Sequence, residues 1–367
     1  MLTKFVVENF KNFEDRLEWN LAEYNNYEFN HEVIGAGAVN KALVFGKNGS
    51  GKSNLGLALF DIIHHLTDKE KLAGKYFPYL NLDAEKQWAQ FEYSFLFDDQ
   101  EVVYSYRKST IQTLLEEHLF INDIEVVSFD YQQHQGFTIL AGAETLNING
   151  ASDISRVKYI KSNAILQDNP ENTAFMHFVN FVDNMLLFYS LDQRGYQGFC
   201  NGSESIGKGI IESGRLEEFQ EFLHTQEIDY RLETREIDGQ PQIYCVFEDG
   251  EANFFSIAST GTTSLALFYY WYIRMESASL VFIDEFDAFY HFTLAKDIVE
   301  RLKRLTNTQI FLTSHNTDLI SNDLLRPDCY FYLQQGKIQA ISELTDKEIR
   351  KAHNLQKMYK AGVFDEI

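Results

Sequence analysis

The stretch from Phe45 to Ser53 holds the residues with the most specific chemistry in this chain. It reads Phe-Gly-Lys-Asn-Gly-Ser-Gly-Lys-Ser and matches the phosphate-binding pattern G-x-x-x-x-G-K-S/T. Its glycines let the backbone curl so that N–H groups face phosphate oxygens. Lys52 is then placed to reach the β- and γ-phosphates of a nucleotide, and the Ser53 hydroxyl to ligate Mg²⁺.

The elements on either side decide between a phosphate-binding loop and a glycine-rich turn before a helix. Residues 42–45 form an apolar run typical of a buried strand, and apolar residues recur at helical spacing over 54–66. Strand, loop and helix together favour phosphate binding, because the helix start adds its positive dipole end. We therefore predict a nucleoside triphosphate site with ATP and Mg²⁺ as cofactors. The expected contacts are Gly46, Asn48, Gly49, Ser50, Gly51, Lys52, Ser53 and Asn54.

An acidic pair follows a buried strand much later in the chain. Residues 280–283 are apolar and lead directly into Asp284 and Glu285. In an α/β sheet the ligand lies beyond the carboxyl ends of the strands, so both carboxylates would lie beside the nucleotide. Asp284 would hold Mg²⁺, and Glu285 would polarise the attacking water as a general base. The alternative is a strand end with two solvated acids.

Two further segments carry polar residues where a strand ends or a helix begins. Residues 308–314 read as a buried strand that leads into His315, for which a surface position is the ordinary alternative. Residues 258–264 contain Ser259 and Gly261 and begin a predicted helix. Small hydroxyl residues and a glycine at a helix start can bind an anion, but the same residues also cap a helix. The chemistry leaves both interpretations open.

Composition limits the class of protein. The chain has 367 residues, 45% of them hydrophobic, which suffices for one large domain or two modest ones. Its net charge of −22 excludes a surface that is basic all over, although a local basic groove stays open. Three separated cysteines fit a reducing cytoplasm better than a disulfide framework or a metal site. No secretory pattern and no apolar run of the ~20 residues that span a bilayer is found. We therefore expect a cytoplasmic protein without a membrane partner.

The predicted elements suggest four segments. Strands are predicted on both sides of residues 9–13, as a hairpin over 91–106, and over 119–129, 136–147 and 228–247. Helices are predicted over 171–191 and 213–225, and no heptad pattern indicates a long coiled coil. The segments are an N-terminal lobe with the P-loop and hairpins (1–150), a mainly helical insertion (151–240), a C-terminal lobe (241–340) and a tail (341–367).

The order of these motifs resembles a known family. A P-loop, a Ser-x-Gly helix start, an Ile-Asp-Glu strand end and a strand ending in Thr-Ser-His are similar to the ABC-type ATPase heads of the RecF, SMC and OLD group. The likeness is closer still to the small bacterial ABC-type ATPases of the AAA family that accompany anti-phage and restriction loci. It covers nearly the full length, through the stretches Glu8–Phe13, Asn163–Asn169, Ser259–Thr262, Ile283–Ala288, Thr313–Leu319 and Arg350–Tyr359.

The resemblance implies a fold and roles for single residues. The fold would be an α/β ABC-type head with a mixed sheet, an antiparallel β subdomain and a helical insertion. His315 would contact the γ-phosphate, and Gln167 would be the Q-loop glutamine that senses Mg²⁺ and the γ-phosphate. Ser259 and Gly261 would contact ATP bound to the opposite subunit, and Asp287 would lie at the dimer interface. Two departures weaken this contact: the helix-start motif is Ser-Thr-Gly-Thr rather than Leu-Ser-Gly-Gly-Gln, and the residues after the acidic pair are unusually aromatic.

Three functions are consistent with these features. The first is an ATPase that forms a homodimer or a higher homo-oligomer and acts as the sensor that controls a separate effector, a nuclease or toxin, in anti-phage defence. The sequence shows no spare cluster for nuclease chemistry, which favours an effector on another chain. The second is a RecF-type DNA-repair ATPase that binds DNA directly. Its candidate basic residues are Arg107–Lys108, Lys158 with Lys161, and Arg301 with Lys303–Arg304. The third, a transporter subunit, ranks last because of the long insertion after the P-loop.

Overall fold

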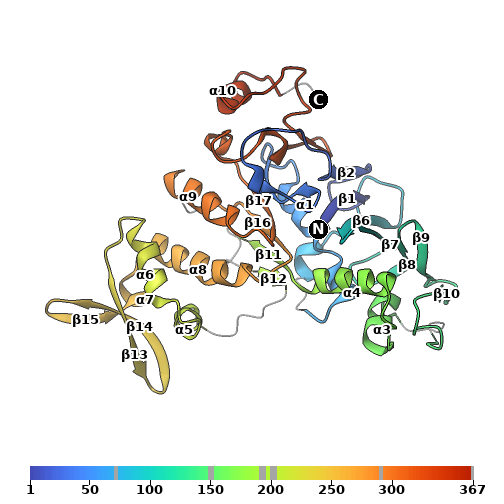
Figure 1. The fold of residues 1–367 in the computed structure, drawn as a ribbon, viewed down its shortest axis with the longest axis horizontal. Helices are drawn as coiled ribbons and strands as arrows, with labels where there is room; N and C mark the ends of the chain where they lie inside the picture. Colours follow the sequence, from blue (N-terminus) through green and yellow to red (C-terminus); the bar gives the residue numbers. More distant parts are fainter. Residues whose placement is uncertain (70–72, 148–152, 190–195, 199–204, 289–291, 365–367) are drawn as a thin grey trace. The chain divides into compact units, whose positions relative to one another are not determined.

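The computed structural model describes residues 1–69, 73–147, 153–189, 196–198, 205–288 and 292–364 (Figure 1). The chain divides into two compact units. The first contains Met1–Phe199, Ala278–Ala288 and Thr306–Ile367, and the second contains Cys200–Ser277 and Phe289–Leu305. The predicted boundaries at 150, 240 and 340 do not follow these units, because strands from distant parts of the sequence pair within the first unit.

An antiparallel sheet forms one layer of the first unit (Figure 1). Its strand order is β10-β9-β8-β7-β6-β1-β2, and each neighbouring pair is antiparallel. Alternate residues of β6 (Phe91, Tyr93 and Phe95) are buried, as the period of two in a strand requires. The strands are β1 Leu2–Glu8, β2 Leu17–Asn20, β6 Ala89–Phe97, β7 Gln100–Lys108, β8 Leu114–Ile121, β9 Ile124–Asp130 and β10 Gln135–Thr138. The predicted hairpin and antiparallel subdomain are confirmed.

Two of the predicted strands have different bounds in the structure. The stretch 119–129 contains the end of β8 and most of β9, because Asn122 and Asp123 both have positive φ angles and turn the chain between them. The stretch predicted as a strand over 136–147 is a strand only to Thr138.

A mostly parallel sheet forms the second layer of the first unit. Its order is β12-β11-β16-β17-β5-β18-β19, in which β11, β16, β17, β5 and β18 run parallel. The edge strands β12 and β19 pair antiparallel. The strands are β5 Lys41–Phe45, β11 Met185–Tyr189, β12 Tyr196–Gly198, β16 Leu280–Asp284, β17 Gln309–Thr313, β18 Tyr330–Gln334 and β19 Lys337–Ala340. A separate short pair joins β3 Ile34–Gly35 to β4 Ala38–Val39. Burial of β5 and β17 along their whole length explains their continuous apolar character.

The helix predicted over 171–191 is wrong in its second half. Helix α4 (Pro170–Asp183) ends at Asn184, and β11 follows immediately. Strand β11 pairs in parallel with β16, with Leu187 opposite Phe282. The cause of the error is physical: a short apolar run buried on all sides fits helix and strand spacing equally well, and the partner strand decides between them.

The helix that follows the P-loop packs between the two sheets. Helix α1 (Lys52–Leu59) approaches β16 at Gly56, and its last carbonyls accept hydrogen bonds from the Tyr93 hydroxyl of β6. The helix predicted over 54–66 is interrupted before α2 (Ile63–Leu66). The remaining helices of this unit are α3 Arg156–Asn163, α10 Leu355–Lys360 and the 3₁₀ turns η1 His31–Val33, η2 Ala73–Tyr76, η3 Thr317–Leu319 and η4 Pro327–Cys329.

The segment between α1 and α2 contains Asp61, which forms a buried ion pair with Lys108 of β7. Both side chains of the Asp61–Lys108 pair are fully buried, and the Lys108 Nζ lies 2.6 Å from Asp61 Oδ1. The hydroxyls of Tyr79 and Tyr106 also donate to this carboxylate, each at 2.9 Å. These contacts fasten the end of the P-loop helix to the antiparallel sheet, since a buried charge must be paired and hydrogen-bonded.

The second unit is built from helices and a small sheet. It contains α5 Ile206–Glu212, α6 Leu216–His224, α7 Phe254–Ile257, α8 Thr260–Met275 and α9 Phe292–Lys303. Its antiparallel sheet contains β13 Arg231–Ile237, β14 Gln240–Phe247 and β15 Gly250–Asn253. The helix predicted over 213–225 is confirmed as α6, and the strands predicted over 228–247 are confirmed as β13 and β14, which turn at Asp238–Gly239. The longest helix in the described parts of the chain is α8, with 16 residues, so no long coiled coil occurs there.

No helix among the described residues has the length and apolar character needed to cross a lipid bilayer.

The contact between α1 and β16 gives a testable prediction. A Cβ atom at Gly56 would lie 2.6 Å from Cε1 of Phe282, whose ring is fully buried. We therefore expect Gly56→Ala to destabilise the protein by about 1–3 kcal/mol, as overpacking in a core does. The measurement is urea denaturation, with Gly74→Ala as the control because a Cβ at Gly74 meets nothing within 4 Å. Equal stabilities of the two variants would contradict the packing described.

Candidate nucleotide-binding site

The P-loop, the acidic pair and His315 meet at the carboxyl edge of the parallel sheet. Thr313 of β17 lies opposite Val44 of β5, and Leu312 lies opposite Ile283 of β16. The segments that follow these three strands therefore begin at the same level. They surround a cavity of about 690 Å³. The described residues that line it are Asn12, Asn48, Gly49, Gly51, Lys52, Ser53, Asn54, Glu285 and His315.

The backbone of the P-loop has the conformation that its glycines allow. Gly49 and Gly51 have φ angles of 79° and 104°, values that favour glycine. A Cβ atom at Gly46 would lie 2.4 Å from the carbonyl oxygen of Leu333, so no larger residue fits there. The Ser50 hydroxyl is buried and has no hydrogen-bond partner among the described residues. This loop is a closely packed turn with a polar group left available for a ligand.

Lys52 is one of the residues that line the cavity. Its side chain is buried, and Nζ donates to the carbonyl oxygens of Gly46 at 2.8 Å and Lys47 at 3.3 Å. Burial lowers the pKa of this ammonium group, and the negative charges of Glu285 and Asp284 oppose the shift. The lysine is therefore a desolvated cation whose charge is balanced by the nearby acidic pair.

His315 joins the lysine to the acidic pair. Its Nδ1 lies 3.4 Å from Lys52 Nζ, and its Nε2 lies 3.2 Å from Oε1 of Glu285. One tautomer satisfies both contacts: Nε2–H donates to the carboxylate, and Nδ1 accepts from the ammonium. Lys52, His315 and Glu285 thus form one continuous polar contact along the cavity.

The backbone at Glu285 is strained. Its φ angle is 46°, in the left-handed region that a residue with a side chain seldom adopts. Such a conformation costs about 1–3 kcal/mol and is typical of functional sites. It turns the chain sharply where β16 ends, beside His315 and the P-loop.

Two hydroxyl residues at the end of β17 organise the acidic pair, and the sequence analysis gave them no role. The Thr313 hydroxyl donates to Oδ1 of Asp284 at 2.7 Å and accepts from the backbone N–H of Glu285 at 2.7 Å. The Ser314 hydroxyl donates to Oδ2 of Asp287 at 2.8 Å. The signal was present in the sequence, because both hydroxyl residues follow an apolar run immediately before His315.

Asn12 is a further residue of the cavity that the sequence analysis did not assign. Its Nδ2 lies 3.4 Å from the carbonyl oxygen of Ser50, and its Oδ1 accepts from Nδ2 of Asn54 at 2.6 Å. The residue comes from the turn between β1 and β2, which the analysis used only as part of the family resemblance. The turn therefore closes over the P-loop.

The predicted contacts Gly46, Ser50 and Asp284 belong to the P-loop and the acidic pair but are not among the described residues that line the cavity. Three further predicted residues, Gln167, Ser259 and Gly261, lie outside these motifs. Gln167 is exposed and does not line the cavity; its backbone N–H donates to Ala141 and its carbonyl accepts from Asn172. Ser259 and Gly261 belong to the second unit. The Ser259 hydroxyl caps α8 by accepting from the backbone N–H of Thr262 at 3.1 Å. The nucleotide contacts of these three residues stay predictions.

The candidate basic residues are largely engaged in ion pairs. Lys108 is buried against Asp61, as described above. Lys158 pairs with Asp68 at 2.6 Å, and Lys161 pairs with Asp183. Among the described residues no group of three or more His, Cys, Asp or Glu could hold a metal ion by itself.

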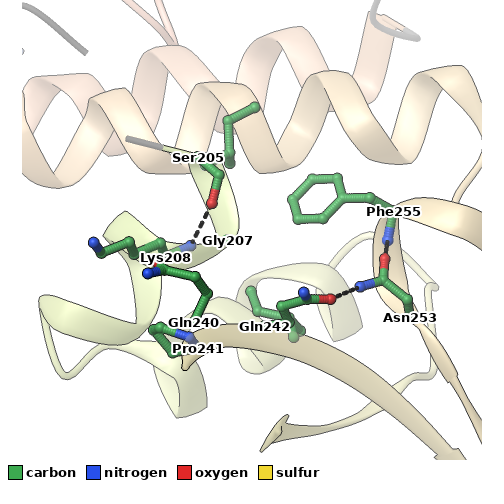
Figure 2. Close-up of a pocket in the computed structure, with 10 residues that line it drawn as sticks. Ser205, Gly207, Lys208, Gln240, Pro241, Gln242, Asn253 and Phe255 are labelled. Atoms are coloured by element: carbon green, nitrogen blue, oxygen red, sulfur yellow. Dashed lines mark hydrogen bonds between the residues drawn. The ribbon is translucent and has the colours of Figure 1, made fainter. Parts of the chain in front are cut away.

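A second cavity, of about 660 Å³, lies within the second unit (Figure 2). Figure 2 shows three amide side chains at this cavity: Gln242 and Asn253 lie on the side of Phe255, and Gln240 lies beside Lys208. Asn253 Nδ2 donates to Gln242 Oε1 at 2.8 Å, and Asn253 Oδ1 accepts from the backbone N–H of Phe255 at 3.0 Å. The described lining has no carboxylate or histidine, so it lacks the acid–base groups found at the P-loop cavity.

The family relationship agrees with the geometry of the first cavity. The AAA_21 family, "AAA domain, putative AbiEii toxin, Type IV TA system", matches residues 41–321, which is more than half of the chain and includes the P-loop, the acidic pair and His315. The chain belongs to this family. The predicted ABC-type head with a mixed sheet and an antiparallel subdomain, and the resemblance to defence-associated AAA-family ATPases, are confirmed. No curated protein matches the chain.

Several solved structures resemble the chain over most of its length. The SMC head domain from Thermotoga maritima is 14% identical with a TM-score of 0.43, and the match covers 92% of this chain and 97% of that chain. An SMC head bound to the C-winged helix domain of ScpA is 13% identical with a TM-score of 0.45, covering 92% and 96%. The SMC head with an extended coiled coil, bound to the C-terminal domain of ScpA from Pyrococcus furiosus, is 12% identical with a TM-score of 0.44, covering 92% and 95%.

The environment of Asp287 predicts a pH-dependent stability. Burial raises the pKa of this carboxyl, and the hydrogen bond from Ser314 only partly opposes the shift. A raised folded-state pKa contributes stability at low pH that is lost as the pH rises through that pKa. Asp287→Asn should therefore raise the melting temperature near pH 7.5 and lose this advantage as the pH falls toward the ordinary pKa of an aspartate, about 3.9.

The measurement is a series of thermal melts of wild type and Asp287→Asn across this pH range. The exposed Asp249→Asn serves as the matched control, for which no such pH-dependent gain is expected. A gain for Asp287→Asn that is the same at every pH would show that burial of the charge is not its cause.

Proposed function

We propose that this chain binds ATP with Mg²⁺ at the P-loop cavity and hydrolyses it to ADP and phosphate. The observation that carries the proposal is the polar contact that joins Lys52, His315 and Glu285 along one cavity. A cation that holds phosphate and a carboxylate that activates water are two of the groups that promote phosphoryl transfer to water.

The residues present fit a triphosphate and its metal ion. The loop offers the Ser50 hydroxyl, which has no hydrogen-bond partner within the described parts of the chain, and a backbone that its glycines allow to curl. Lys52 offers its ammonium group. Mg²⁺ would be held by the Ser53 hydroxyl and by Asp284, whose carboxylate Thr313 orients. When bound, the ion would neutralise part of the charge on the phosphates. Few protein ligands and several waters are usual for Mg²⁺.

The remaining side chains have separate roles in the proposed reaction. Glu285 would accept a proton from the attacking water. His315 would hold that carboxylate through Nε2–H and contact the γ-phosphate, while Lys52 holds the β- and γ-phosphates. Gln167 would reach the metal ion only after a rearrangement of the loop that carries it, because it does not line the cavity.

We further propose that the complete site is shared between two copies of the chain. Ser259 and Gly261 lie at the exposed start of α8, where backbone N–H groups and the hydroxyl are suited to an anion. In this proposal the α8 start of one subunit caps the γ-phosphate held by the P-loop of the other. ATP binding and subunit association would then stabilise each other by linkage.

The wider role that we propose is the control of a separate effector, a nuclease or toxin, in anti-phage defence. The support is the family, whose description names a toxin of a type IV toxin–antitoxin system. The alternative, direct DNA binding by a repair ATPase, has less support, because the basic residues Lys108, Lys158 and Lys161 are held in ion pairs.

Hydrolysis is tested by Glu285→Gln. The amide keeps the size of the side chain but removes the general base, so we expect ATP to bind with turnover slowed by about 10²–10⁴-fold. The measurement is phosphate release under saturating ATP, with the exposed Glu101→Gln as the matched control. Normal turnover by Glu285→Gln would assign the base to another residue, with His315 examined next.

The shared site is tested by mixing two inactive variants. Lys52→Ala lacks a working P-loop, and Ser259→Arg lacks a working α8 start. A mixed dimer would contain one intact site and one inactive site. In an equal mixture about half of the dimers are mixed, so random pairing should restore up to about one quarter of wild-type turnover.

The matched control for the mixing test is Lys52→Ala combined with a chain that carries both substitutions, because this mixture contains no intact P-loop. It should stay inactive. A failure of Lys52→Ala and Ser259→Arg to restore activity, although mixed dimers form, would exclude a site shared in this way.

A further inference from the structure

The turn that follows β17 connects the nucleotide cavity to the C-terminal helix α10. It carries His315 and leads into η3. Ser314 Oγ, which donates to Asp287, also accepts from the backbone N–H of Asn316 at 2.8 Å. Asn316 Oδ1 in turn accepts from the backbone N–H of Asp318 at 3.0 Å. A continuous set of hydrogen bonds therefore runs from the residues beside the acidic pair to Asp318.

Helix α10 contacts the other end of this set. Gln356 Nε2 donates to Oδ1 of Asp318, and Lys360 Nζ lies 3.2 Å from the same oxygen. Gln356 and Lys360 are 38 and 42 residues from Asp318 in the sequence, so these contacts join two distant segments of the chain. Among the described residues, the carboxylate of Asp318 is contacted only by side chains of α10, while its backbone N–H donates to Asn316.

The C-terminal segment is anchored independently of Asp318. Leu355 is buried, and the ring of Tyr359 packs edge-on against Tyr332 of β18 with centroids 5.8 Å apart. The buried Asn322 donates through Nδ2 to carbonyl oxygens in the loop before α10, the nearest being that of Arg350 at 3.0 Å. The contacts to Asp318 are half-exposed, so their removal should change stability little.

We propose that Asn316 and Asp318 are positioning residues through which α10 sets the place of His315 in the nucleotide site. His315 lies between Ser314 and Asn316, and both neighbours are fixed by this set of hydrogen bonds. A shift of α10 would move η3 and with it the imidazole that contacts Lys52 and Glu285. The effect on turnover rests on the proposed ATPase function, whereas the effect on the position of His315 does not.

The test removes the contact between Asp318 and α10 in two different ways, giving two cut variants, and compares them with a matched control. Asp318→Ala removes the carboxylate, and Gln356→Ala/Lys360→Ala removes both donors from α10. Lys357→Ala changes an exposed lysine of the same helix whose side chain does not contact Asp318. Lys360→Arg is the conservative variant and should keep wild-type behaviour.

The first readout is the environment of His315, measured by the ¹⁵N chemical shifts of its imidazole ring. These signals are assigned by their loss in His315→Gln. We expect these shifts to change in Asp318→Ala and in Gln356→Ala/Lys360→Ala, but not in Lys357→Ala. Unchanged imidazole shifts in both cut variants would overturn the inference, whether or not the wild type hydrolyses ATP.

The second readout is steady-state ATP hydrolysis. For half-exposed contacts we expect kcat to fall by about threefold to fivefold in both cut variants, with KM and the melting temperature unchanged. Combining all three substitutions should lower kcat no further, because they act on one path. A kcat equal to wild type, or a fall that follows a loss of melting temperature, would overturn the inference. A wild type that turns over no ATP would instead contradict the proposed function, and the imidazole shifts would then decide the inference alone.

Discussion

The site depends on the parallel pairing of β17 with β16 on one side and β5 on the other. This register places Leu312 opposite both Ile283 and Leu43, so the three strands end together. Lys52 of the P-loop is 263 residues from His315, and Glu285 of the acidic pair is 30 residues from it, yet each of the three groups follows one of these strands. A shift of a parallel strand by one residue would turn its side chains to the opposite face and separate these groups. The buried apolar strands thus hold the polar site together.

The polar groups at this edge are individually unfavourable and are stabilised by their surroundings. Lys52 is a buried cation, Asp287 is a largely buried carboxyl, and Glu285 has a left-handed backbone. Hydroxyl groups from the end of β17 satisfy the acids, and His315 links the lysine to Glu285. The two sheets and α1 between them hold the backbone of Glu285 in its strained conformation. Such strain is expected where function requires a local conformation of high energy.

The motifs of the site could be predicted from sequence because each has a local pattern. The P-loop glycines, the strand ending in Asp284–Glu285 and the strand ending in His315 are all read within ten residues. Strand β11 could not be separated from helix α4, because a short buried apolar run has no distinguishing period until its partner β16 is known.

Unlike Thr313 and Ser314, whose signal is local, two other residues have contacts that only the fold reveals. Asn12 meets Ser50 and Asn54 only once the turn after β1 lies over the P-loop, and Lys108 of β7 meets Asp61 in the segment between α1 and α2. No spacing within one segment reveals such pairs, since the fold alone brings them together. For the same reason Lys108 was counted among the candidate DNA-binding residues although it is fully buried.

Binding of ATP by the P-loop is the claim on which the rest of the account depends. The most direct measurement is calorimetric titration of ATP with Mg²⁺ into the wild type and into Lys52→Ala, with circular dichroism to establish that both are folded. The account predicts saturable binding to the wild type and its loss in Lys52→Ala, because the ammonium held at Gly46 and Lys47 is the cation that faces the phosphates. Equal ATP affinity of the two folded proteins would contradict it.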